Sequence, residues 1–157
     1  MSKIANLRQE LAESRARLNE VLNQVGDRWT TQVYSDGAQW NVGQLLTHLM
    51  ISEAGMFRTA KGIANGEEGV PADFDLERYN KRSVEKQADT TPQQAHAELE
   101  STRTALLAWM CDLSDEQLAR TGRHASLKML SVEEFLHTIA SHEKTHADDM
   151  ARALNTR

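Results

Sequence analysis

The sequence predicts an all-α protein, a four-helix bundle with a long crossover between its second and third helices. Apolar residues recur at helical spacing in four separate segments, the chain contains only two prolines, and the alternation typical of half-buried strands is absent. With 157 residues, of which 39% are apolar and 26% charged, we expect one domain over residues 1–157. Amphipathic helices of this number and length most simply pack as a bundle.

The first two helices are predicted from apolar spacing and from capping residues. The first helix covers residues 4–25, where apolar residues recur at steps of three, four and seven, and Gly26 ends it. A loop through residues 35–37 follows. The second helix begins at Asn41, which has capping-box spacing with Gln44.

A polar, turn-rich stretch separates the second helix from the third. It runs over residues 67–90 after Asn65–Gly66 and is long for a connection within a compact domain. The third helix begins at Thr91, and the last begins at Ser131 with Glu134 as its capping partner. With a short first link and a long second one, helices two and three are expected to be parallel, and helix four antiparallel to helix two.

Charge and composition limit the functional class. A net charge of -5 argues against a nucleic-acid partner, which needs a basic face. No apolar run is long enough for a membrane span, and the first ten residues lack a signal-peptide core. The single cysteine, Cys111, excludes an internal disulfide and a cysteine zinc cluster, and we expect it to be buried. We therefore predict a cytoplasmic protein without a membrane partner, in which histidines and carboxylates hold any metal.

The last predicted helix has three polar residues on its apolar face. Counted from Ile139 at roughly 100° per residue, His146 lies about 20° away and His142 about 60° away. Glu143 lies about 40° from the same reference. The two histidines are one turn apart, so their imidazoles can point at a common ion. Residues 142–146 also match the H-E-x-x-H string of zinc proteases, but no third ligand or upstream strand supports that class.

A third metal ligand must come from another helix. His48 lies roughly 10 Å from the start of the second helix and comes level with His146 if helices two and four are antiparallel. It lies toward the flank of the apolar face of its helix, so it could face a neighbouring helix and not the bundle axis. Glu53 falls at the centre of the apolar face of the second helix, and Arg103 does so on the third. Glu53 and Glu143 are candidate general bases or partners that orient an imidazole. Arg103 could hold an anionic group of a substrate.

Structural explanations exist for the same residues. A buried histidine is commonly only hydrogen-bonded, and a histidine pair at this spacing can be structural. Glu53 and Arg103 could neutralise each other as a buried pair. Three further histidines are expected at the surface or in loops, outside the ligand set: His96, His124 and His137. Two aspartates are expected to face solvent or the rim of the site: Asp148 and Asp149.

At these residues the sequence resembles the DinB/YfiT-like superfamily. The matching pieces are residues 40–49 together with Glu53, and residues 131–147. Between them, residues 74–82 resemble the crossover of the family, and residues 113–118 resemble its turn after the third helix. The resemblance covers nearly the whole chain, and its motifs have the same order and spacing.

The resemblance implies a bundle with a long crossover, often dimeric, that holds a divalent metal such as zinc or nickel. One histidine of helix two and two of helix four hold that metal, and they correspond to His48, His142 and His146. Characterised relatives include thiol-dependent S-transferases and isomerases that use mycothiol or bacillithiol. We therefore expect a metal-dependent enzyme acting on a small molecule, either a hydrolase or a transferase or isomerase with a low-molecular-weight thiol. The alternatives are a non-catalytic metal- or ligand-binding bundle and a structural or interaction module.

Overall fold

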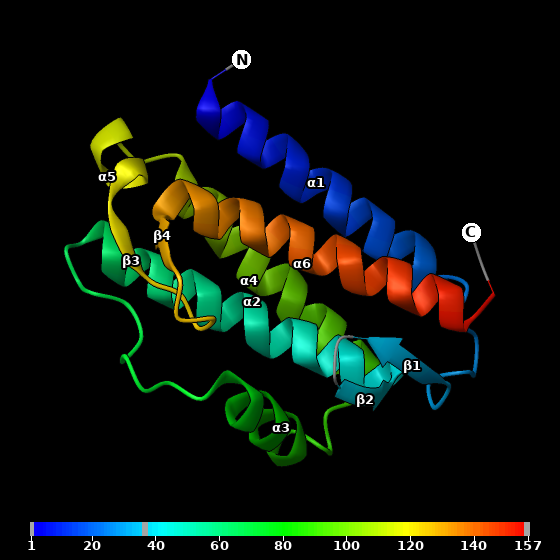
Figure 1. Cartoon of the computed structure of the whole chain (residues 1–157). Helices are drawn as coiled ribbons and strands as arrows, with labels where there is room; N and C mark the ends of the chain where they lie inside the picture. The colour runs from blue at the N-terminus through cyan, green and yellow to red at the C-terminus, as the bar shows by residue number, and fades with distance from the viewer. Residues whose placement is uncertain (1, 36–37, 156–157) are drawn as a thin grey trace.

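Four long helices form the bundle (Figure 1). The computed structural model describes residues 2–35 and 38–155. In it α2 and α4 run parallel and α6 runs antiparallel to α2 (Figure 1), while α1 packs mainly against α6. The predicted fold class and helix directions are confirmed. The bundle helices are α1 (Lys3–Leu22), α2 (Val42–Ala64), α4 (Pro92–Met110) and α6 (Val132–Ala153).

Side-chain caps determine where the bundle helices begin. The Asn41 side chain accepts a hydrogen bond from the Gln44 backbone, and the Gln44 side chain accepts one from the Asn41 backbone. Thr91 and Gln94 form the same reciprocal pair at the start of α4. These bonds satisfy backbone N–H groups that have no partner inside the helix, so the starts predicted from the sequence are those observed.

Two short antiparallel hairpins precede the helices that carry the candidate site. They are β1 (Gln32–Ser35) with β2 (Ala38–Asn41), and β3 (Thr121–Arg123) with β4 (Met129–Ser131). The expectation of a chain without strands was wrong, because strands of three or four residues are too short to display alternation. Of the loop expected at residues 35–37, residues 36 and 37 lie outside the described residues. Each hairpin leads directly into α2 or α6 and thereby positions the start of that helix.

The long crossover contains a helix of its own, α3 (Leu76–Lys86), which the Asp75 side chain caps. This helix packs along α2 on the outside of the bundle (Figure 1). A second short helix, α5 (Asp115–Ala119), follows α4. None of the described helices combines the length and apolar character needed to span a membrane. The crossover is thus a folded wall beside α2.

The core of the bundle consists of two apolar clusters, one toward each end. Leu45 and Leu99 belong to the cluster near β1 and β2, and Leu106 and Phe135 belong to the other. On each bundle helix, one buried charged residue lies between the two clusters. Cys111 is exposed, contrary to expectation, because it lies at the C-terminal cap of α4 and not in the apolar interior.

Candidate metal centre

Three histidines from two helices converge in the bundle. His48 lies on α2, and His142 and His146 lie one turn apart on α6. The Nε2 atom of His142 lies 3.2 Å from Nε2 of His48 and 3.1 Å from Nε2 of His146. One ligand atom from each residue lies within 4.8 Å of the others. The antiparallel arrangement of α2 and α6 therefore brings together the three residues that the sequence singled out.

The geometry of these nitrogens fits a divalent ion. Zinc binds imidazole nitrogen at about 2.0–2.1 Å, which places neighbouring tetrahedral ligands about 3.3 Å apart. The observed separations of 3.1 and 3.2 Å are close to that value. A neutral imidazole has only one N–H and one lone pair, so three facing nitrogens cannot all satisfy one another by hydrogen bonding. A shared cation satisfies all three lone pairs.

Polar side chains lie beside the Nδ1 atoms of two of the histidines. Ser52 Oγ lies 3.3 Å from Nδ1 of His48, and Asp149 Oδ2 lies 3.6 Å from Nδ1 of His146. Carboxylates in this position fix the tautomer and orientation of a ligand imidazole. Asp149 was expected in solvent or at the rim, but it is 7% exposed. Its spacing of three residues from His146 was a signal for this contact.

Burial keeps the imidazoles of His48 and His142 neutral. Burial, together with the charge of His146, lowers the pKa of His48 to about 3. Burial lowers the pKa of His142 well below its usual value, and the charges of His146, His48 and His124 act in the same direction. Neutral rings are the form that binds metal.

The shifted histidines predict that the metal-free protein loses stability in mild acid. Between pH 6.5 and about 3 the unfolded chain protonates His48 while the folded chain does not. Protons therefore favour unfolding, and the free energy of unfolding decreases as the pH falls from 7 to 5. The slope of the free energy of unfolding against pH approaches about 1.4 kcal/mol per pH unit for each histidine with a lowered pKa. Urea unfolding at each pH, with chelator present, measures the free energy of unfolding. If a His48→Gln variant keeps the full slope, the loss of stability does not come from His48.

Both predicted catalytic carboxylates lie in a buried ion-pair cluster, formed by one residue from each bundle helix. Its members are Arg15 of α1, Glu53 of α2, Arg103 of α4 and Glu143 of α6, none more than 7% exposed. Arg103 donates to Glu53 Oε2 from Nε at 3.2 Å and to Glu53 Oε1 from Nη2 at 2.5 Å. Arg15 donates from Nε to Glu143 Oε2 at 2.9 Å and from Nη2 to Glu53 Oε1 at 3.2 Å.

The hydrogen bonds of the cluster show which groups the two carboxylates contact. The alternative of a buried Glu53–Arg103 pair is the arrangement observed. Glu143 also accepts from Ser14 at 2.8 Å, and none of the hydrogen bonds of either carboxylate among the described residues goes to a histidine ring. Arg15 was missed, although its position on α1 between Leu11 and Leu18 places it on the apolar face.

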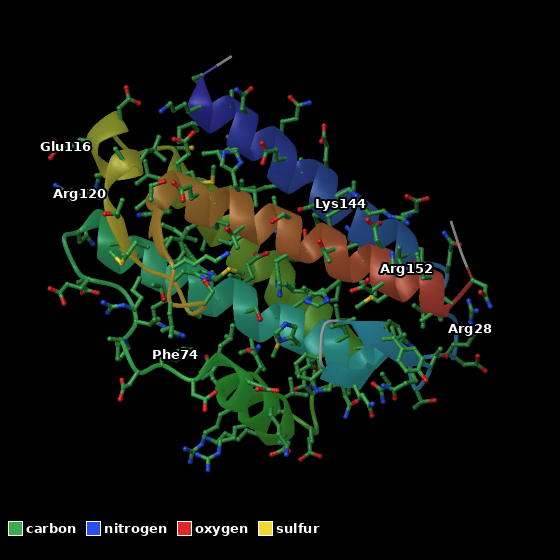
Figure 2. The ribbon with its side chains drawn as sticks, in the orientation of Figure 1. Arg28, Phe74, Glu116, Arg120, Lys144 and Arg152 are labelled. Atoms are coloured by element: carbon green, nitrogen blue, oxygen red, sulfur yellow. The ribbon has the colours of Figure 1, made fainter. Side chains whose placement is uncertain are left out.

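A cavity of about 300 Å³ opens beside the histidines. It lies between α2, α3, the β3–β4 hairpin and α6, and His48 and His142 form part of its wall. Phe74, in the segment that leads into α3 (Figure 2), contributes to the apolar side of the wall. A cavity of this size with an apolar lining and a few polar groups suits a small organic molecule.

The cation at this cavity is Arg58 of α2, not Arg103. Arg103 is 5% exposed and is held by Glu53, Glu143 and the Leu11 carbonyl oxygen, so it is not part of the cavity wall. Arg58 lines the cavity, and none of the described residues forms an ion pair with it. Its guanidinium is therefore available to an anionic group in the cavity.

Comparison with known proteins places this geometry in a family. A family model described as the DinB superfamily matches residues 10–150. A protein of Oceanobacillus iheyensis named "Putative metal-dependent hydrolase OB0413" is 24% identical over 139 residues, covering 88% of this chain and 78% of that protein. YfiT from Bacillus subtilis, described as "a probable metal-dependent hydrolase with an unusual four-helix bundle topology", has a similar structure. The two structures match with a TM-score of 0.77 at 22% identity, and the match covers 100% of this chain and 91% of YfiT.

Two further solved structures have the same fold. The mycothiol-dependent maleylpyruvate isomerase matches with a TM-score of 0.71 at 15% identity over 96% of this chain. The match spans only 63% of the isomerase. The colibactin self-resistance protein ClbS, solved with double-stranded DNA, matches with a TM-score of 0.74 at 14% identity, covering 98% of this chain and 96% of that one. At these identities the solved structures establish a common fold alone.

Proposed function

Because this chain belongs to the DinB superfamily, we propose that it is a metal-dependent enzyme acting on a small molecule. Its ligands for a divalent ion, zinc or nickel, are His48, His142 and His146. The observation that carries the proposal is the convergence of three imidazoles, two of which form part of the wall of a cavity. Three protein ligands leave coordination positions open, which is the pattern of a catalytic site and not of a structural one.

The reaction is either hydrolysis or a thiol-dependent transfer or isomerisation. His48, His142 and His146 would hold the divalent ion, which would supply a water or thiol with a lowered pKa as a nucleophile at neutral pH. The apolar wall formed by α3 excludes bulk water from the substrate, and Arg58 pairs with an anionic group on it. Both hydrolysis and thiol transfer use this arrangement, and the names of the relatives include a hydrolase and a mycothiol-dependent isomerase.

Glu53 and Glu143 keep a part in this proposal, but not as general bases. Their oxygens accept hydrogen bonds from guanidinium groups and from Ser14, so their lone pairs are engaged. We assign them the role of joining α2 and α6 through the arginines, which holds the helices that carry the ligands at a constant separation. Asp149 takes the orienting role toward His146.

The reaction partner is proposed to be a small molecule and not a nucleic acid or a membrane. The net charge of -5 is unfavourable for binding a polyanion, and the cavity volume suits a small ligand. The DNA in the ClbS structure is bound by ClbS and is a finding about that protein. A cytoplasmic location and a homodimer stay predictions, the latter to be measured by analytical ultracentrifugation.

Metal content and turnover together test the proposal. We expect about one zinc or nickel ion per chain, removed by chelator. Metal at a hundred times its Kd should then stabilise the stripped protein by about 2.7 kcal/mol. Nitrophenyl esters, and a chlorinated nitrobenzene with mycothiol or bacillithiol, probe the two reaction classes, and chelator should abolish turnover. Metal without turnover in either panel would indicate a binding module, and the absence of both would indicate a structural bundle.

A further inference from the structure

One face of α2 runs along the length of the cavity. Four residues of this helix line the cavity at helical steps of four, three and four: His48, Ser52, Gly55 and Thr59. Gly55 follows the candidate ligand His48 by seven residues, which at 1.5 Å per residue places it roughly 10 Å further along the same face. The cavity therefore extends about two helical turns beyond the candidate metal centre.

Two polar side chains from different helices approach the space above Gly55. A β-carbon built on Gly55 would lie 3.8 Å from Nη2 of Arg58 and 3.9 Å from the hydroxyl oxygen of Tyr79. Arg58 belongs to α2 and Tyr79 to α3, which lies alongside α2 (Figure 1), and both residues line the cavity. Arg58 also borders a groove between α2 and α4, but its Nη2 lies close to Gly55. The guanidinium and the phenol thus approach one point of the cavity wall, which the missing glycine side chain leaves open.

Both polar groups are accessible to a molecule in the cavity. Tyr79 is 37% exposed and Arg58 is also exposed. Among the described residues, none accepts a hydrogen bond from the Arg58 guanidinium or from the Tyr79 hydroxyl. The Tyr79 ring packs beside that of Phe74, with the centroids 5.3 Å apart, and this contact holds the hydroxyl over Gly55. Two hydrogen-bond donors are therefore available at the same place.

The charge at this end of the cavity indicates which ligand group it suits. Arg58 is the one lysine, arginine, aspartate or glutamate among the described residues that line the cavity, so a single positive charge faces the space. A guanidinium pairs with both oxygens of a carboxylate through parallel N–H groups, and a phenol can donate one further hydrogen bond to the same group. One cation balances one carboxylate but not a doubly charged phosphate. The largely apolar lining elsewhere suits an apolar body attached to that carboxylate.

We propose that Arg58 and Tyr79 form a carboxylate-binding subsite, roughly 10 Å along α2 from His48. The substrate class is then an amphipathic carboxylic acid with its reacting group at the histidine end and its apolar body between α2 and α3. Its carboxylate lies between the guanidinium and the phenol. Both residues are positioning residues, because holding the far end of the molecule fixes the orientation of the reacting end. The reacting end rests on the proposed function, whereas the preference for a carboxylate does not.

Two probes of the same chain length separate carboxylate recognition from metal binding. Suberate monohydroxamate has a metal-binding hydroxamate at one end of an eight-carbon chain and a carboxylate at the other. Octanohydroxamate has the same chain and the same metal-binding group but ends in a methyl group, which a purely apolar cavity would favour. Calorimetry measures the binding of each probe to the zinc-loaded protein. We expect the parent to bind suberate monohydroxamate about 10-fold more tightly than octanohydroxamate.

Three variants test whether this preference comes from the subsite. Arg58→Gln should remove the preference, and Tyr79→Phe, which keeps the ring beside Phe74, should reduce it about threefold. Arg78→Gln is the matched control, because it removes a positive charge next to Tyr79 on α3 but lies outside the cavity wall, so it should keep the preference of the parent. Equal affinity of the parent for both probes would overturn the proposal. So would a full preference in Arg58→Gln or Tyr79→Phe, or equal losses in Arg58→Gln and Arg78→Gln.

A second measurement does not depend on the metal. In the chelator-treated protein, octanoate should shift the NMR signal of the Arg58 Nε–H group, which is identified by its absence from Arg58→Gln. The neutral analogue octanamide should leave that signal in place. A shift with neither molecule, or the same shift with both, would overturn the carboxylate subsite. If zinc fails to tighten the binding of either hydroxamate, the proposed function falls, and the octanoate result still decides whether the subsite exists.

Discussion

The substitution His142→Ala is expected to abolish metal binding while leaving the fold intact. In the parent protein, Nε2 of His142 is the central atom of the three ligand nitrogens, 3.2 Å from Nε2 of His48 and 3.1 Å from Nε2 of His146. Its loss leaves two ligands on different helices. Removing an outer-shell partner weakens metal affinity by about 10–100-fold, and removing a direct ligand should exceed that range. Metal titration and thermal unfolding with and without zinc measure the effect, and the variant should no longer be stabilised by zinc.

His137→Ala is the matched control for this experiment. His137 lies on the same helix, five residues before His142, and its Nδ1 lies 2.6 Å from Glu10 on the surface of α1. The chemical change is identical, but the candidate centre is untouched, so zinc affinity should stay at the parent value. Parent-like zinc affinity in His142→Ala would refute the proposed ligand set. Equal losses in both variants would point to a general effect on α6.

The substitution Glu53→Ala is expected to produce the largest loss of stability in the protein. Glu53 is 3% exposed and accepts hydrogen bonds from both buried guanidinium groups. Its removal leaves Arg15 and Arg103 facing each other with too little negative charge between them. Breaking a buried ion pair on one side costs about 3–5 kcal/mol, a large part of the 5–15 kcal/mol typical of a domain. Urea unfolding at pH 7 measures the difference.

A double substitution distinguishes the free-energy cost of leaving a buried charge unpaired from the contribution of the ion pair to stability. Glu53→Met with Arg103→Met removes both charges and fills the space with apolar side chains. Well-packed apolar replacements of buried ion pairs are often neutral or stabilising, so this variant should unfold at higher urea than Glu53→Ala. If the two losses are equal, or if Glu53→Ala costs less than about 1 kcal/mol, the buried pair is not the source of stability assigned to it.

The ion-pair cluster links the stability of the bundle to its candidate site. Each of the four bundle helices contributes one member, so satisfied bonds require all four helices to be in a single register. Glu143 follows the candidate ligand His142 directly on α6. A shift of α6 relative to α2 would break ion pairs and separate the histidines at the same time. The cluster therefore favours the register in which the three imidazoles meet.

Much of the bundle could be predicted because local chemistry determines it. The Asn41–Gln44 and Thr91–Gln94 capping pairs mark helix starts through bonds that span only three residues. The periodicity of apolar residues also placed His142 and His146 on the interior face of the last helix, whereas it placed His48 toward the flank of its own apolar face. By contrast, hairpins of three or four residues have no readable period, and the helix in the crossover has a largely polar sequence.

By itself, then, the sequence determined the four bundle helices, their directions and the two histidines on the apolar face of the last helix, since helical spacing relates each side chain to its own helix axis. Only the tertiary structure decided which groups meet across helices. It paired Glu53 and Glu143 with arginines, enclosed Arg103, and placed Arg58 and His124 in the wall of the cavity. A buried carboxylate has the same signature in a sequence whether its neighbour is a guanidinium or a substrate. The neighbour is decided by packing between segments far apart in the chain, which helical periodicity does not encode.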